Sequence, residues 1–308
     1  MIDYLVLGSL NADALYLVHN FPNVGETIHS YDYMPMLGGK GGNQAAAIAR
    51  LGGSVAMAGR VGNDVFGPRS IENLRNQGVD TQTIIIDERH PTGTATGIVS
   101  DDGKNIIVVS SGANGQVLKQ DVDNLQPLFD QAKFLILQFE IPIDTVVYAL
   151  EKANESPIKA ILNPAPAYDL PRESYEKIHY LIPNEKEAAL ITSIEVTDLT
   201  SAEKAGRRLA DWGVRNTIIT LGDNGALLVT KNKTSHFPAV SVNAIDPTAC
   251  GDAFVGGFAI GLGKGYPIEN AIEYANCAGA MAATRFGAQP SLPNAQEVDE
   301  LYNKNYQK

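Results

Sequence analysis

Apolar residues gather in short runs that recur along the first three quarters of the chain, with segments of helical spacing between them. Six runs are typical of strands buried on both faces: YLVLGS (4–9), SVAMAGR (54–60), KFLILQ (133–138), KAILN (159–163), NTIITL (216–221) and ALLVT (226–230). The segments with helical spacing are 43–51, 68–77, 144–154, 185–192, 201–213, 252–263, 268–285 and 295–303. This alternation predicts an α/β fold with a doubly wound, mostly parallel sheet flanked by helices on both faces.

Two regions depart from this pattern. Residues 12–37 and 82–111 alternate polar with apolar positions and carry few helix signals. Such alternation is typical of antiparallel strands with one solvated face, and the Asp102–Gly103 pair marks a hairpin turn. We therefore expect one domain over 1–308 with a small β-sheet lid formed from about 12–37 and 82–111. The alternative is that these strands extend the main sheet.

Composition limits the classes of partner. The chain has 24 basic and 35 acidic residues and a net charge of -11, which argues against nucleic acid and anionic membranes as partners because phosphate contacts need clustered Lys and Arg. The cysteines, Cys250 and Cys277, show no C-x-x-C spacing, so we expect a cytoplasmic protein without disulfides or structural zinc. The first apolar run is expected to be a strand rather than a signal peptide, and no apolar stretch is long enough to span a membrane.

Polar residues that are suited to ligand binding follow the first strand. In GSLNADA (8–14), Asn11 and Asp13 are two positions apart, so an extended backbone directs both side chains to one side. An amide and a carboxylate together suit adjacent hydroxyl groups of a ligand. Ordinary turn chemistry is the alternative.

A glycine-rich stretch, LGGKGGNQAAAIARLGG (37–53), opens a helix. Its glycines allow close approach of the backbone to a ligand, and Lys40 and Asn43 add a cation and an amide. The stretch is not a P-loop, because Lys40 is followed by Gly41 instead of Ser or Thr. Glu140 in LQFEIP lies just past an apolar strand, at the edge where such folds bind ligands. A flexible turn and a solvated loop glutamate are the alternatives.

Two later stretches suit a nucleotide. In YLIPNEKEAALI (180–191), Asn184 and Glu187 are placed either to form a helix cap or to face a nucleotide phosphate with its Mg²⁺. TIITLGDNGALL (217–228) predicts a hairpin whose GDNG turn suits the floor of a nucleotide site.

The stretch DPTACGDAF (246–254) brings small residues and a carboxylate to a helix start. Backbone amides of Ala249, Cys250 and Gly251, if they point into one space, form an anion-binding nest at the positive end of the helix. Asp252 then lies where it can accept a proton from an attacking hydroxyl. The alternative is that Asp252 only caps the helix.

Taken in order, these motifs resemble the ribokinase family of sugar kinases, within the phosphofructokinase-B superfamily. The motifs are GSLNAD, GGKGGNQA, NPAPA (163–167), PNEKEA (183–188), TLGDNG (220–225), DPTACGDAF and RFGAQPSLP (285–293), and they extend over essentially the whole chain. The resemblance implies a doubly wound domain with a β-sheet lid, and a homodimer in which the lids of two subunits clasp. NPAPA and GAQPS favour the ribokinase branch.

The resemblance also implies roles for matching positions. The sugar would be held by Asn11, Asp13, Gly39, Lys40, Asn43, Glu140 and Asp252. The ATP site would be lined by Asn184, Thr220, Gly222, Gly225, Gly251 and Asn276. Glu187 would act on Mg²⁺ through water, Ala249, Cys250 and Gly251 would form the anion hole, and Asp252, ionised near neutral pH, would be the catalytic base. A K⁺ site would involve Asp246, Thr248, Ala282, Arg285, Gly287 and Ser291.

The implied activity is ATP-dependent phosphorylation of the primary hydroxyl of a pentose, D-ribose giving D-ribose 5-phosphate. Fructose, deoxyribose or a nucleoside as acceptor, or a non-catalytic sugar or nucleotide sensor, are the alternatives. Two positions depart from the family pattern. Pro247 stands where Thr is usual, which removes a backbone donor from the cation loop. Cys250 stands where Gly or Ala is usual. We expect it to be a small packing residue, and the alternative is a thiol that ionises more readily because it lies near a helix N-terminus.

Overall fold

The computed structural model describes residues 1–307 and is built around a nine-stranded sheet. The strand order is β13-β12-β11-β10-β9-β8-β1-β4-β5. The strands are β1 (Tyr4–Leu7), β4 (Val55–Gly62), β5 (Ile84–Asp87), β8 (Phe134–Leu137), β9 (Lys159–Leu162), β10 (Tyr180–Leu181), β11 (Asn216–Thr220), β12 (Ala226–Val229) and β13 (Thr234–Phe237). All neighbours from β5 to β11 pair in parallel, whereas β11, β12 and β13 form an antiparallel edge.

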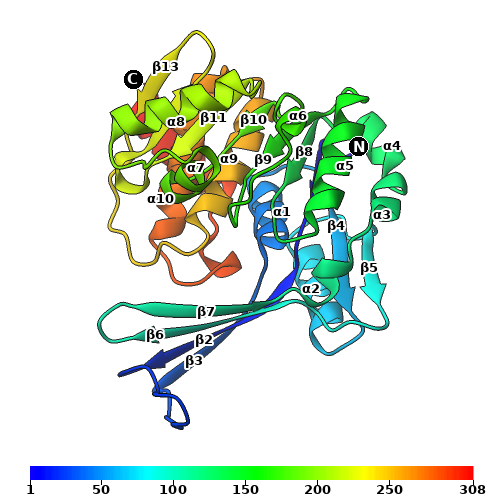
Figure 1. Ribbon diagram of the computed structural model, residues 1–308, viewed down its shortest axis with the longest axis vertical. Helices are drawn as coiled ribbons and strands as arrows, with labels where there is room; N and C mark the ends of the chain where they lie inside the picture. Colours follow the sequence, from blue (N-terminus) through cyan, green and yellow to red (C-terminus); the bar gives the residue numbers. More distant parts are fainter. Residues whose placement is uncertain (308) are drawn as a thin grey trace.

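Helices cover both faces of this sheet (Figure 1). One face packs on α1 (Lys40–Arg50), α2 (Phe66–Asn76), α9 (Cys250–Gly263), α10 (Ile268–Ala283) and α11 (Ala295–Tyr306). The other packs on α3 (Lys119–Asp123), α4 (Gln126–Gln131), α5 (Ile143–Asn154), α6 (Arg172–Tyr175), α7 (Glu185–Thr192) and α8 (Leu199–Asp211). In β1, Tyr4 and Val6 join the first core while Leu5 and Leu7 join the second. This alternation explains why the strand is apolar at every position, and it confirms the predicted fold class.

A second, four-stranded sheet projects from the body (Figure 1). Its order is β3-β2-β6-β7, from β2 (Asn11–Val18), β3 (Asp32–Gly38), β6 (Thr94–Ser100) and β7 (Asn105–Ser110). Three short 3₁₀ turns, η1 (Gly112–Gln116), η2 (Gly222–Asn224) and η3 (Gln289–Ser291), complete the fold. Among residues 1–307, no helix is both long and apolar enough to cross a membrane.

The lid differs from the expectation in two ways. β5 lies within the expected segment 82–111 but pairs with β4 in the main sheet. The central lid strands β2 and β6 run parallel, not antiparallel. The parallel pairing is possible because β3, α1, β4, α2 and β5 intervene between β2 and β6, and a crossover of this length permits parallel pairing where a tight hairpin would not.

Helix α1 begins at Lys40, inside the glycine motif, three residues before the predicted start at 43. Glycine is a poor helix former, but tertiary packing decides here. A Cβ on Gly41 would lie 2.7 Å from backbone atoms of Gly8 and Ser9, so only glycine allows the first turn to lie against the end of β1.

Candidate active site

The carboxylate of Asp252 lies in the first turn of α9 and is bound by two side chains from α1. Nδ2 of Asn43 donates a 2.9 Å hydrogen bond to Oδ2, and Nε2 of Gln44 donates one of the same length to Oδ1. Asp252 is only 7% exposed. The residue at the N-cap of α9 is Ala249, which makes no side-chain cap, so Asp252 faces α1 and is not a helix cap.

The protonation of Asp252 is controlled by opposing effects. Burial raises its pKa, while the charge of Lys40 and the hydrogen bonds from Asn43 and Gln44 lower it, and the net shift is upward. The direction of this shift alone does not decide whether Asp252 is ionised near neutral pH, so that expectation stays a prediction. A base with a raised pKa is a better proton acceptor.

Other predicted sugar residues gather near Asp252. Glu140 accepts hydrogen bonds from Oγ of Ser9 and from the backbone N–H of Lys40, the latter at 2.9 Å. Burial opposes the charge of Lys40, yet Asp252, Glu140 and Glu187 together raise the pKa of its ammonium group. Lys40 is thus the cation around which three predicted site carboxylates are arranged.

Asp13 and Asn11 come from β2, at the edge between the two sheets. Oδ1 of Asp13 accepts a 2.9 Å hydrogen bond from the backbone N–H of Ala95. Burial raises the pKa of Asp13 to about 7, with a smaller contribution from Glu140 and against the effect of that hydrogen bond. Oδ1 of Asn11 accepts a 2.7 Å hydrogen bond from Nδ2 of the buried Asn114, so the NH₂ group of the Asn11 amide faces away from Asn114.

Gly39 connects these residues to α1. Its φ of 82° is in the region that favours glycine. A Cβ there would lie 2.8 Å from the backbone nitrogen of Asn11. The position therefore requires glycine for both its dihedral angle and its close approach to β2.

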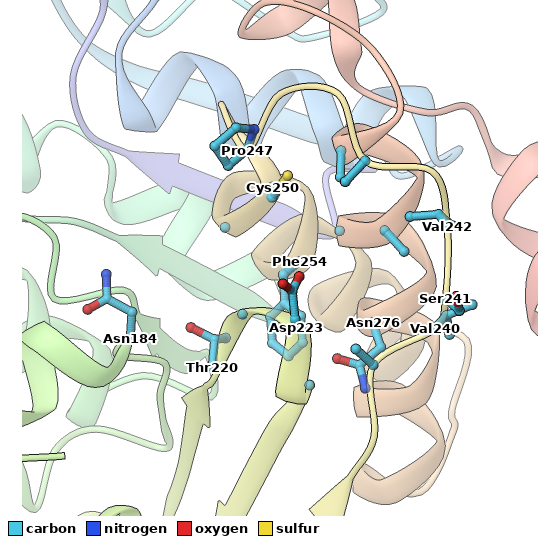
Figure 2. A pocket seen from close by; sticks show the side chains of 18 of the residues that line it. Asn184, Thr220, Asp223, Val240, Ser241, Val242, Pro247, Cys250, Phe254 and Asn276 are labelled. Carbon is cyan, nitrogen blue, oxygen red and sulfur yellow. The ribbon is translucent and has the colours of Figure 1, made fainter. Parts of the chain in front are cut away.

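A pocket of about 830 Å³ lies beside the N-terminus of α9. The predicted nucleotide residues that line it are Asn184, Thr220, Gly222, Gly225, Cys250, Gly251 and Asn276. Figure 2 shows Asn184 and Thr220 on one side of the pocket and Val240 and Asn276 on the other. The amide of Asn276 donates to the carbonyls of Phe237 and Pro238, which holds the chain segment that forms this wall.

The start of α9 has the geometry of an anion-binding nest. Ala249 adopts a left-handed conformation with φ 59° and ψ 7°, unusual for a residue other than glycine, and Cys250 begins the right-handed helix. The N–H of Cys250, one of the three predicted nest donors, donates a 3.2 Å hydrogen bond to the carbonyl of Pro247. A strained residue at this point favours a functional role over a simple turn.

The thiol of Cys250 is not activated, so the alternative of a readily ionised thiol is wrong. Burial, with Asp246 and Asp252, raises the pKa of Cys250 to about 11. Burial is the largest of these causes, and the two nearby carboxylates add to it.

Asn184 and Glu187 form a reciprocal helix cap. Oδ1 of Asn184 accepts from the backbone N–H of Glu187 at 2.8 Å, and the Glu187 carboxylate accepts from the backbone and side-chain nitrogens of Asn184 at 2.9 Å. Burial raises the pKa of Glu187 despite the Asn184 hydrogen bond and Lys40. The cap accounts for the motif locally, and it also fixes the Glu187 carboxylate near Lys40.

The predicted cation residues join two loops. Oδ1 of Asp246 accepts from the N–H and hydroxyl of Thr248, and Oδ2 accepts from the N–H of Gly287 at 2.8 Å. Arg285 pairs with Glu297, and the hydroxyl of Ser291 donates to the carbonyl of Ala288. The backbone N–H of Arg285 reaches the carbonyl of Ala282, so Ala282 lies at the start of the same turn.

Sequence reasoning gave no role to the amides Gln44, Gln138 and Asn163, although Gln44 and Asn163 lie in the quoted motifs GGKGGNQA and NPAPA. It also passed over residues 239–245, most of which line the pocket. That segment has no helix or strand, and its sequence carries no motif.

Comparison with known proteins agrees with this geometry. Residues 1–295 match the model of the pfkB family of carbohydrate kinases. The chain is 36% identical to a ribokinase of Staphylococcus aureus, over 96% of this chain and 98% of that one, and 33% identical to a deoxyribokinase of Salmonella typhi, over 99% and 100%. The structure of Arabidopsis thaliana ribokinase complexed with ribose and ATP superposes with a TM-score of 0.92 at 28% identity, over 98% of this chain and 99% of that one. The chain therefore belongs to the pfkB family of carbohydrate kinases.

Proposed function

We propose that the chain is an ATP-dependent kinase that phosphorylates the primary hydroxyl of D-ribose to give D-ribose 5-phosphate. The observation that carries this proposal is the position of Asp252. Its carboxylate is bound by Asn43 on the side of the sugar residues, and its neighbour Gly251 lines the large pocket on the other. An alcohol held on the first side and a terminal phosphate held on the second would meet at this carboxylate.

In this mechanism the protein mainly positions the reactants and stabilises charge, as phosphoryl transfer requires. Asn11, Asp13, Gly39, Lys40, Asn43 and Glu140 hold the sugar hydroxyls. Asp252 accepts the proton of the attacking hydroxyl, a contribution of roughly 10²–10⁴-fold in rate. The amides of Ala249, Cys250 and Gly251 receive charge on the transferred phosphoryl group, and one such donor is worth about 3–4 kcal/mol in comparable sites.

We assign Glu187 to the water shell of Mg²⁺, which accompanies ATP and neutralises phosphate charge when bound. Within residues 1–307, no three His, Cys, Asp or Glu side chains are arranged to hold a metal ion unaided. Mg²⁺ usually binds through substrate phosphates, water and one or two carboxylates. The single half-buried Glu187 beside the pocket residue Asn184 fits that pattern.

We also infer a K⁺ site between the loops at 246–248 and 285–291. Asp246 ties Thr248 to Gly287, which brings the two loops together. Pro247 supplies no backbone N–H but keeps its carbonyl, so an oxygen-lined site remains possible in this sequence. Comparing turnover in K⁺ with turnover in choline at equal ionic strength tests this site.

A homodimer through the lid completes the proposal. Every residue of β7 is exposed, including the apolar run Ile106 to Val109. An exposed apolar edge strand is a liability unless a partner covers it.

The decisive experiment is a coupled ADP-release assay over pentoses, hexoses and nucleosides. We expect the highest kcat/KM with D-ribose. The specific alternative is 2-deoxyribose, which the 33% identity to a deoxyribokinase favours. ATP turnover with none of these acceptors would support a non-catalytic sensor and contradict the proposal.

A further inference from the structure

Gln44 is fully buried, and both N–H donors of its side-chain amide are hydrogen-bonded. Nε2 donates to Oδ1 of Asp252 at 2.9 Å and to Oδ1 of Asn163 at 3.1 Å. Oε1 accepts from Nε2 of Gln138 at 2.6 Å. Gln138 is also fully buried. Three amides at the ends of β8 and β9 and on α1 are thus connected to the carboxylate on α9.

The orientation of each amide in this relay is determined by a backbone carbonyl at its far end. The carbonyl of Ile182 can only accept, so Nδ2 of Asn163 must face it at 2.9 Å. Oδ1 of Asn163 therefore faces Gln44, which directs Nε2 of Gln44 at both Asn163 and Asp252. Oε1 of Gln44 then faces the nitrogen of Gln138. Reversing any one of these amides would bring two acceptor oxygens, or two donor NH₂ groups, face to face.

The relay also accounts for the glycine at the start of GSLNAD. A Cβ at position 8 would overlap Oε1 of Gln138. Gly8 therefore makes room for Gln138 between β1 and α1, and the motif contributes to the site without touching a ligand.

The two oxygens of Asp252 have different surroundings. Oδ1 is bound by Gln44, which has no solvent exposure, whereas Oδ2 is bound by Asn43, which is 7% exposed. A side chain at position 38 would contact both Asp13 and Asn43, so Asn43 lies toward the predicted sugar residues. Oδ1 of Asn43 is buried and has no hydrogen-bond partner within residues 1–307.

We propose that Gln44 is a positioning residue that anchors Oδ1 of Asp252 through Gln138 and Asn163, and that Oδ2 is the oxygen that accepts the proton of the sugar hydroxyl. This assignment rests on the proposed function. In the step, the O–H bond of the sugar breaks and an O–H bond forms at Oδ2. The hydroxyl oxygen bonds to the terminal phosphorus of the nucleoside triphosphate, and the nucleoside diphosphate leaves with the electron pair of the broken P–O bond.

The test is Gln44→Met, which keeps the length of the side chain and removes its donor. A hydrogen bond to a charged group favours the ionised form. We expect the acidic limb of the kcat profile to move to higher pH by about one unit, and kcat near neutral pH to fall about 10-fold or more, with a smaller change in KM for the sugar. The matched control is Gln126→Met, which removes an amide-to-carboxylate hydrogen bond, to Asp130, on the surface. It should leave the profile unchanged.

Two further measurements separate positioning from general stability. Gln138→Met should move the limb in the same direction, and should have no further effect in the Gln44→Met background, because Gln138 acts only through Gln44. Carboxyl titration of Asp252 by carbon-13 NMR, without ligands, should give a higher pKa in Gln44→Met than in the wild type. An unshifted titration would overturn the positioning role whatever the turnover. Full turnover by Asp252→Asn would overturn the role of Asp252 as proton acceptor, whereas no ATP turnover by the wild type with any acceptor would overturn the proposed function.

Discussion

Asn43 and Asp252 share a 2.9 Å hydrogen bond although 209 positions separate them in the chain. The contact joins the first turns of α1 and α9, two helices on the same face of the main sheet. Helix α1 follows the lid strand β3, and α9 follows the irregular segment 238–249, so neither helix comes directly after a parallel strand. The contact brings together the amide that we propose to bind the sugar and the carboxylate that we propose to accept the proton.

Replacing Asp252 with Asn should abolish most activity without unfolding the protein. Asn keeps the size of the side chain but cannot accept a proton, so we expect kcat to fall by about 10²–10⁴-fold. The two amides that now donate to Asp252 would face one oxygen and one NH₂ group, so some loss of stability is expected too. Thermal unfolding measured beside kcat separates these effects. Asp130→Asn, at an exposed site, is the control, and near-normal turnover by Asp252→Asn would remove this residue from the mechanism.

Much of the architecture could be predicted because buried parallel strands are apolar at consecutive positions and helices show their own spacing. The ends of α7 were predicted correctly, since Asn184 caps it with Glu187 and such caps are visible in sequence. The parallel pairing of β2 with β6 could not be predicted. Alternation identifies a half-buried strand but not its neighbour or its direction.

The candidate site divides in the same way. Short motifs identify Asp252, Asn43 and Asp13 as candidate site residues, because charged and amide residues among glycines stand out in the sequence. Gln44 was missed because an amide inside a helix is ordinarily a surface residue. Only the packing of α1 against the ends of β8 and β9 shows that it is buried and bound at both ends. That packing depends on contacts across the whole fold.

The affinity for the sugar should weaken as the pH falls through 7. Asp13 has a pKa of about 7 in the ligand-free protein, so below that pH its carboxyl is mostly protonated and is a poorer acceptor for sugar hydroxyls. We expect calorimetric titrations with D-ribose to show a rising Kd between pH 8 and pH 6. Asp13→Asn should bind weakly and lose this pH dependence. A wild-type Kd that is constant over the range would contradict the assignment of Asp13.

The same variant should make the ligand-free protein more stable at alkaline pH. The folded state holds the Asp13 proton up to about pH 7, whereas an ordinary carboxyl releases it near 3.8. The folded state therefore loses stability as pH rises through this window, and the loss persists above pH 7. Because a pKa shift of one unit corresponds to about 1.36 kcal/mol, the upper limit of this loss of stability is about 4 kcal/mol. Denaturant unfolding of the wild type and of Asp13→Asn at pH 5 and pH 8 measures this loss. We expect the free energy of unfolding of the variant, relative to that of the wild type, to be higher at pH 8 than at pH 5. A difference between the two proteins that is equal at both pH values would contradict this expectation.

The left-handed conformation of Ala249 predicts a graded response to substitution. A β-branched residue tolerates φ near 59° poorly, so Ala249→Val should distort the anion hole and cost about 1–3 kcal/mol of stability. Ala249→Gly accepts this φ and should lose less activity. We expect Ala249→Val to raise KM for ATP and lower kcat together. Kinetics of Ala249→Val that match those of Ala249→Gly would argue against a nest at this position.

The lid strand β7 predicts a dimer that charge can split. Ile107 and Val109 lie on one face of the strand, and Ile106 and Val108 on the other, with exposures of 61%, 57%, 47% and 65%. Replacing both residues of one face with Glu would put like charges into a two-fold interface, so we expect one of the two double variants to sediment as a monomer where the wild type is a dimer. Asn105→Glu, at an exposed polar position of the same strand, is the matched control. Two double variants that both remain dimeric would place the interface elsewhere, and a monomeric wild type would contradict the proposed dimer.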